Sequence, residues 1–321
     1  MSDVLIVSPA RPDELLGNAV TANRWAAILG RLGRDVEIAQ EYDGQPCDML
    51  VALHARRSAP SIERFAREHP GRPLLVALTG TDIYRDIHRD AAARRSLELA
   101  TRLVVLHGRG GDALPDHLRG RVRSIYQSVD VPESRPSRAP TGFQVCVLSH
   151  LRPVKDPFLT ARAARLLPGS STIHIVHLGR ALSPEMEAAA RAEVAANPRY
   201  EWRGELPRDE ALHVLAGSQL HVLTSQLEGG ANVVGEAVAL GVPTLSTEIA
   251  GSVGLLGEDY PGYFPVGDAR ALATLLDRAE TDPHLLGQLR DACARRAHLF
   301  RPEVELAAWR DLLDEIDSSS S

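Results

Sequence analysis

Residues 220–246 read LHVLTSQLEGGANVVGEAVALGVPTLS and contain the two patterns that alternate along this chain. The run 220–224 is short and apolar, as a buried strand is. Residues 232–240 have helical spacing, and Gly241 and Pro243 are residues that commonly end a helix. The apolar run 242–246 follows. The stretch therefore predicts a strand, a helix and a second strand, which is the repeating unit of a parallel sheet.

The same alternation fills the first 130 residues. Apolar runs rich in Val, Ile and Leu occur at 4–10, 36–40, 47–55, 73–80, 101–108 and 122–128. Between the first two runs, one apolar helix face is marked by Ala19, Trp25, Ile28, Leu29 and Leu32. Gly33 follows this face as a typical helix end. The pattern predicts six strands separated by helices.

The segment 131–142, VPESRPSRAPTG, interrupts this periodicity with three prolines and reads as a connection between domains. A second alternation follows. Its predicted strands are 143–149, 172–179, 200–204, 220–225 and 242–246, and its predicted helices include 157–167, 185–195 and 208–216. We therefore predict two doubly wound, Rossmann-like α/β domains, 1–138 and 139–302, facing across a ligand cleft, with a last helix at about 303–317 packing back on the first.

Composition excludes several classes of protein. The chain has 44% apolar and 24% charged residues, as folded globular proteins do. A net charge of −6 and only 4% aromatic residues argue against nucleic acid as a partner. Three widely spaced cysteines form no metal or disulfide pattern. Because no apolar run is long enough for a signal peptide or a membrane span, we expect a cytoplasmic protein.

Two common nucleotide-binding motifs are absent from the sequence. No G-x-G-x-x-G follows the first predicted strand, and no G-x-x-x-x-G-K-[ST] occurs. A dinucleotide-dependent dehydrogenase and a P-loop NTPase are therefore disfavoured.

Two carboxylates flank a glycine pair in the first stretch. Glu228 lies in the predicted strand-to-helix loop and Glu236 one turn inside the helix. Gly229 and Gly230 allow the backbone to approach a ligand, and the N–H groups of a helix start can bind phosphate. Carboxylates accept hydrogen bonds from sugar hydroxyls. Alternatively, both glutamates are helix-start acids stabilised by the helix dipole.

The motif Glu228-x7-Glu236, with EAVALGVP after it, resembles that of the retaining glycosyltransferases of the GT-B fold. The resemblance implies that Glu236 binds the ribose of a nucleotide and Glu228 the donor sugar. It also implies nucleotide-sugar contacts from Gly229, Gly230, Ala231, Asn232 and Val233. In SHLRPVKDP, Arg152 and Lys155 stand where relatives hold the donor diphosphate, so that charge on the leaving group would be stabilised without a metal or other cofactor. Alternatively, Arg152 and Lys155 are solvated surface residues without a role in binding.

The first domain carries the same resemblance more loosely. Gly17 and Asn18 stand where relatives have a glycine-rich loop. LTGTDIY resembles the family's His-Gly-x-Asp turn, but Thr79 replaces the histidine. Thr81 and Asp82 are then candidate acceptor contacts, although Asp82 is as well explained as a helix N-cap. His107 either lines the cleft or is a hydrogen-bonded core histidine.

Four segments, 42–58, 149–157, 227–237 and 251–268, together resemble the selenosugar synthase (SenB) family of selenoneine biosynthesis. The resemblance implies transfer of a sugar from a UDP-sugar, best known as UDP-N-acetylglucosamine, to selenophosphate, with release of UDP and phosphate.

The residues themselves add a physical reason for an anionic acceptor. LHARRS places His54, Arg56, Arg57 and Ser58 at a strand end and helix start, a common anion site. A basic helix start paired with surface acids is the alternative. Two other functions stay open: a glycosyltransferase that acts on a hydroxyl of a small metabolite, and a nucleotide-sugar-binding protein without activity.

Overall fold

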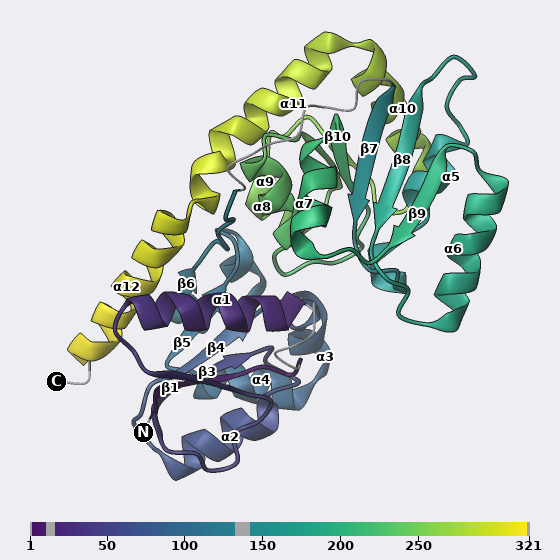
Figure 1. The fold of residues 1–321 in the computed structure, drawn as a ribbon. Helices are drawn as coiled ribbons and strands as arrows, with labels where there is room; N and C mark the ends of the chain where they lie inside the picture. Colours follow the sequence, from purple (N-terminus) through teal and green to yellow (C-terminus); the bar gives the residue numbers. More distant parts are fainter. Residues whose placement is uncertain (1, 11–16, 132–141, 320–321) are drawn as a thin grey trace. The chain divides into compact units, whose positions relative to one another are not determined.

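The computed structural model describes residues 2–10, 17–131 and 142–319. Contacts divide the chain into two compact units (Figure 1). The first comprises Met1–Gln127, Glu228–Gly230 and Pro302–Ser321, and the second comprises Ser128–Leu227 and Ala231–Arg301. The boundary predicted at 138 lies outside the described residues, as does all but the two ends of the connection predicted at 131–142.

The first unit is built on a sheet of six parallel strands in the order β2-β1-β3-β4-β5-β6. The strands are β1 (Ser2–Val7), β2 (Val36–Ala39), β3 (Cys47–Leu53), β4 (Leu74–Leu78), β5 (Arg102–Val105) and β6 (Val122–Ser124). The helices are α1 (Gly17–Arg31), α2 (Ala59–Glu68), α3 (Ile87–Arg89), α4 (Ala91–Leu99) and α12 (Pro302–Ser319). A π-helical turn, η1 (Asp82–Asp86), and two 3₁₀ turns, η2 (Gly110–Ala113) and η3 (Asp116–Arg121), complete the unit.

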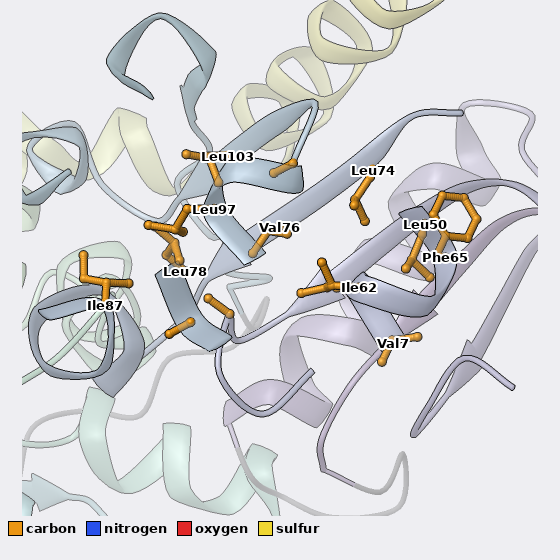
Figure 2. Packing of buried hydrophobic residues seen from close by; sticks show 14 of the residues in the cluster. Val7, Leu50, Ile62, Phe65, Leu74, Val76, Leu78, Ile87, Leu97 and Leu103 are labelled. Carbon is orange, nitrogen blue, oxygen red and sulfur yellow. The ribbon is translucent and has the colours of Figure 1, made fainter. Parts of the chain in front are cut away.

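Both faces of this sheet are buried. Alternate residues of a strand point to opposite faces, so Leu5 and Val7 of β1 join a cluster with side chains of α2. Figure 2 shows Val7 in this cluster with Ile62 and Phe65 of α2. Residues from β3, β4, β5 and α4 complete that layer. Val4 and Ile6 point the other way and pack with side chains of α1 and α12. Burial on both faces explains why the strands read as nearly continuous apolar runs.

The last helix, α12, is attached to the first unit by aromatic and polar contacts. The ring of Trp309 meets that of Trp25 edge to face, with centroids 4.9 Å apart. The indole N–H of Trp25 donates to the buried carboxylate of Glu305 at 2.9 Å. Further along α12, Glu315 accepts hydrogen bonds from Arg102 at 3.0 Å and Arg123 at 2.7 Å. Apolar side chains of α12 pack with those of α1 and of β1, β3, β4 and β5 in one cluster.

The second unit contains another sheet of six parallel strands, in the order β12-β11-β10-β7-β8-β9. The strands are β7 (Phe143–Leu148), β8 (Ile173–Leu178), β9 (Tyr200–Gly204), β10 (Leu220–Leu223), β11 (Thr244–Thr247) and β12 (Tyr263–Phe264). The helices are α5 (Leu159–Ala164), α6 (Pro184–Ala196), α7 (Arg208–Ala216), α8 (Asn232–Ala239), α9 (Ala250–Leu256), α10 (Ala269–Thr281) and α11 (Pro283–Arg296). The short 3₁₀ turns are η4 (Pro153–Lys155) and η5 (Ala297–Phe300).

The predicted strands are confirmed in both units, and the predicted doubly wound α/β class with them. The helix predicted at 157–167 is shorter in the structure, where α5 comprises Leu159–Ala164. The chain after it forms a tighter turn, in which the N–H groups of Leu166 and Leu167 donate to carbonyls three residues earlier. The predicted helix ends at Gly33 and Gly241 have φ of +86° and +69°, which glycine adopts without strain. No helix in the described part of the chain has the length and apolarity needed to cross a bilayer.

Replacing Trp309 by Ala should destabilise the first unit. The substitution removes a fully buried ring and leaves a cavity beside Trp25, which typically costs about 3–5 kcal/mol. Urea unfolding followed by far-UV circular dichroism measures this loss. Arg310→Ala, at an exposed neighbouring position of α12, is the control and should change the free energy of unfolding little. Equal stability of the two variants would contradict the attachment described for α12.

Three buried histidines make the fold sensitive to acid. Burial lowers the pKa of His107 and His177 to about 4 and that of His221 to about 3. The unfolded chain takes up these protons near pH 6.5, so the free energy of unfolding should fall as the pH drops from about 6.5 to about 4. In His177→Gln this slope should be shallower, whereas the exposed His88→Gln should keep it. Urea titrations across this pH range provide the measurement, and an unchanged slope in His177→Gln would contradict it.

Candidate functional site

The order of the second sheet creates a divergence between two central strands. β7 and β10 are neighbours, with Leu220 beside Val145 and His221 beside Cys146. The chain continues from β7 to β8 on one side and from β10 to β11 on the other. Ligands in open α/β sheets bind at the carboxyl ends of strands where the order reverses in this way. The loops after β7 and β10 are therefore the candidate site in this unit.

The loop after β7 carries Arg152 and Lys155 on a short, well-defined turn. Arg152 precedes the 3₁₀ turn η4, and its carbonyl accepts a hydrogen bond from the Lys155 N–H at 3.0 Å. Asp156 closes the turn in the left-handed region at φ +40°. Its carboxylate accepts hydrogen bonds from Arg162 of α5 at 2.9 and 3.1 Å. The side chain of Arg152 is exposed and that of Lys155 is half-buried.

Two hydrogen bonds hold this loop against the loop after β10. The Thr224 hydroxyl donates to the carbonyl of Lys155 at 2.7 Å, and the Gln226 N–H donates to the carbonyl of Val154 at 2.8 Å. The Thr247 hydroxyl of β11 in turn donates to the carbonyl of Ser225 at 2.6 Å. Both cross-loop bonds use carbonyls of the turn. The side chains of Arg152 and Lys155 therefore project from a fixed backbone.

The start of α8 has features of an anion site. Its N-cap residue, Ala231, has no side-chain acceptor, and the first turn contains no acidic residue. The first N–H groups of α8 are therefore not capped by a side chain. The side-chain oxygen of Asn232 is buried and has no hydrogen-bond partner in the described part of the chain. Val233 is buried, and Gly229 and Gly230 lie in the preceding turn without a left-handed φ.

The two glutamates are buried, with Glu228 9% and Glu236 4% exposed. Glu228 lies in the turn between β10 and α8. Glu236, on α8, forms an ion pair with Arg208 of α7, whose Nη1 lies 2.7 Å from Oε1 of the carboxylate. Arg208 is not identified by the sequence patterns, because no local motif relates the first residue of α7 to a glutamate 28 positions later.

A second polar cluster lies in the first unit, at the carboxyl ends of β3 and β4. The carboxylate of Asp82 is fully buried and accepts hydrogen bonds from the N–H groups of Ala55 at 2.9 Å and Gly80 at 2.8 Å. Thr81 is the N-cap residue of η1 and does not cap it through its side chain. Asp82 thus fastens the loop after β3 to the loop after β4.

The His54 side chain lies between two buried carboxylates. Its Nδ1 is 3.9 Å from Asp82, its Nε2 is 3.8 Å from Asp86, and Nε2 also approaches the Thr81 hydroxyl at 3.4 Å. Burial lowers the pKa of His54, against the opposing effect of the two carboxylates. The residue has φ +74°, a left-handed conformation uncommon outside glycine.

The two arginines after His54 differ in their surroundings. Arg56 donates to the buried carboxylate of Asp86 at 2.8 Å, and Arg85 donates to its other oxygen at 3.1 Å. Burial raises the pKa of Asp86, but these hydrogen bonds outweigh it and the pKa lies below its ordinary value. Arg57 is exposed, and its backbone N–H donates to Nδ1 of His54 at 3.3 Å.

His107 lies after β5 and has both ring nitrogens engaged. The Tyr84 hydroxyl lies 2.8 Å from Nε2, and the Arg109 N–H donates to Nδ1 at 3.3 Å. The side chain is fully buried, which favours the core-histidine interpretation. Gly17 and Asn18 begin α1, which follows β1 in the chain, and residues 11–16 before them lie outside the described part.

The candidate residues therefore form two groups, one in each unit. The loop after β7 carries Arg152 and Lys155, and α8 carries Asn232 and Glu236. In the first unit, the segments that follow β3 and β4 carry His54, Arg56, Arg57, Thr81 and Asp82. Within the described residues, no group of three or more His, Cys, Asp or Glu side chains is arranged to hold a metal ion.

Solved structures share the fold of this chain at low sequence identity. HepE from Anabaena, solved with UDP and glucose, matches 99% of this chain and 100% of its own, with a TM-score of 0.75 and 16% identity. Sucrose-phosphate synthase from Thermosynechococcus elongatus matches 98% and 99%, with a TM-score of 0.78 and 14% identity. The pneumococcal O-GlcNAc transferase GtfA, solved with UDP and GlcNAc, matches 94% of this chain and 60% of its own, at 0.67 and 14%.

A family comparison covers just over half of the sequence. Residues 132–299 match the model of the family described as glycosyl transferases group 1. This range includes the loops after β7 and β10. The chain therefore belongs to the group 1 glycosyl transferases, and its two Rossmann-like units are those of the GT-B fold.

Proposed function

We propose that this glycosyltransferase transfers a sugar from a UDP-sugar to the selenium of selenophosphate. Binding of the UDP-sugar donor is supported by the pair of hydrogen bonds from Thr224 and Gln226. These bonds hold the loop of Arg152 and Lys155 beside the loop that leads into α8. The acceptor half is supported by the resemblance of four segments to selenosugar synthases and by the arginines after His54.

The loops after β7 and β10, together with α8, offer the interactions that a nucleoside diphosphate sugar requires. Arg152, Lys155 and the uncapped start of α8 would bind the diphosphate. The carboxylate of Glu236 would accept hydrogen bonds from ribose hydroxyls, and that of Glu228 from the donor sugar. The unpartnered side-chain oxygen of Asn232 suits a hydroxyl or N–H donor from the same ligand. UDP as the nucleotide is supported by HepE and GtfA, both solved with UDP.

The reaction requires little acid–base chemistry from the protein. A selenium lone pair of selenophosphate attacks the anomeric carbon, and the bond from that carbon to the UDP oxygen breaks with its electron pair leaving on UDP. Water then cleaves the Se–P bond, its oxygen going to phosphate and a proton to the selenol. Selenophosphate is already anionic at neutral pH, so no base is needed to activate it. Arg152 and Lys155 would stabilise the charge that develops on UDP.

The first unit would bind the acceptor at the ends of β3 and β4. Arg57 presents an exposed guanidinium, and a guanidinium can bind two oxygens of a phosphoryl group at once. The loop that carries it is held by Asp82 and by the Ser58 hydroxyl, which donates to the carbonyl of Leu53 at 2.6 Å. Gly17, Asn18 and Thr81 would complete this region.

A hydroxyl acceptor is the second candidate, and one observation favours it. Arg56 is already paired with the buried carboxylate of Asp86, and Asp82 adds another buried carboxylate nearby. The net positive charge around Arg56 and Arg57 is therefore smaller than the sequence of two adjacent arginines suggests, which weakens the case for an anionic acceptor.

Removing either basic side chain after β7 should slow turnover. Arg152→Ala and Lys155→Ala should each lower kcat by at least ~10²-fold, because charge on the leaving UDP is no longer stabilised. The cross-loop hydrogen bond uses the carbonyl of residue 155, so the loop should keep its place in both variants. Steady-state release of UDP provides the measurement, with the exposed Arg270→Ala as control. EDTA should leave the wild-type rate unchanged, since no metal is needed. Near-normal kcat in both variants would contradict the role of Arg152 and Lys155 in stabilising the leaving group.

The acceptor can be identified by mass spectrometry of oxygen-free reactions. With UDP-N-acetylglucosamine and selenophosphate, we expect a sugar product with the selenium isotope pattern, together with UDP and phosphate. In Arg57→Ala the KM for selenophosphate should rise by about 10-fold, since a charge-assisted contact is lost, and the KM for the UDP-sugar should stay unchanged. Arg89→Ala, exposed on the same unit, is the control. Release of UDP only when an alcohol is supplied would identify the hydroxyl acceptor instead.

A further inference from the structure

The ion pair between Arg208 and Glu236 has an unusual position. Glu236 is buried on α8, whereas the side chain of Arg208 is 40% exposed on the first residue of α7. Asp209 and Glu210, also in the first turn of α7, have the sign of charge that a helix N-terminus favours. Arg208 has the opposite sign there. Its position is therefore not explained by the stability of its own helix.

The pair is better explained by the requirements of the buried carboxylate. An ionised carboxylate taken out of water needs hydrogen bonds or an opposite charge. Arg208 contacts Oε1 of Glu236, and Oε2 receives no hydrogen bond from the described part of the chain. One oxygen is thus held by the protein, and the other is left for a further donor.

We propose that Arg208 is a positioning residue for nucleotide binding, which holds Oε1 of Glu236 so that Oε2 accepts hydrogen bonds from the ribose hydroxyls. This inference rests on the proposed role of Glu236 at the ribose. A guanidinium suits the task because it is planar and always charged, so it fixes both the orientation and the counter-charge of the carboxylate. Arg208 acts through Glu236 and needs no contact of its own with the nucleotide.

The inference is tested by calorimetric binding of UDP and of 2′,3′-dideoxy-UDP, which lacks the ribose hydroxyls. The wild type should bind UDP at least ~10-fold more tightly than the dideoxy compound, the effect of a hydrogen bond to a charged acceptor. Arg208→Gln should bind UDP about 10-fold more weakly than the wild type does. Its affinity for the dideoxy compound should stay within about 2-fold of the wild-type value. Arg208→Lys, which keeps the charge, should recover part of the preference.

Two controls separate positioning from a general structural effect. Arg191→Gln removes an Arg–Glu pair of similar length, 2.6 Å, from the surface of the same unit and should leave both affinities unchanged. Thermal unfolding shows whether each variant is folded. If Arg208→Gln is unfolded, Arg208→Met, which keeps the aliphatic part of the side chain, replaces it in the binding experiment.

Three outcomes would overturn the inference. Equal weakening of both ligands would mean that Arg208 contacts the diphosphate or the base directly. Unchanged affinities would mean that the pair has no part in binding. A wild type with no preference for UDP over the dideoxy compound would overturn the ribose role of Glu236 itself, and this inference with it.

Discussion

Parallel pairing of strands is the constraint on which the rest of this structure depends. In a parallel sheet each strand must be followed by a crossover, so all loops that leave carboxyl ends emerge at the same edge. Residues far apart in sequence are thereby brought together, as the hydrogen bond from Thr224 to the carbonyl of Lys155 illustrates. The same constraint places the loop of His54 beside that of Asp82 in the first unit. The sheet order thus brings together, in each region, loops that are far apart in the sequence.

The two regions satisfy their buried charges in different ways. In the first unit, both oxygens of Asp82 accept hydrogen bonds from backbone N–H groups and both oxygens of Asp86 accept from guanidiniums, so each buried carboxylate is paired within the protein. In the second unit, Glu236 has one cationic partner and the start of α8 lacks a side-chain cap. An added nucleotide would therefore complete the second network, whereas an acceptor bound at the first would depend mainly on Arg57.

Much of this fold could be predicted from the sequence, because strands buried on both faces leave long apolar runs that are easily recognised. β12 was missed, since two residues, Tyr263 and Phe264, are too few to form a pattern. The sequence alone singles out Glu228 and Glu236 as candidates because they lie in one short motif. Arg208 and Asp86 cannot be singled out in this way, because their pairing with Glu236 and Arg56 arises only in the folded chain.

The backbone of His54 gives a reason to regard the end of β3 as more than a structural turn. A non-glycine residue at φ +74° carries an energetic cost of order 1–3 kcal/mol, and such residues persist only where surrounding contacts enforce them. Here the enforcing contacts are the bond from Ala55 to Asp82, the bond from Ser58 to Leu53, and a bond from the Ser96 hydroxyl to the Ala55 carbonyl at 2.8 Å. A simple helix start would need none of them. Strained residues of this kind concentrate at functional sites, and His54 lies directly before the segment that carries Arg56 and Arg57.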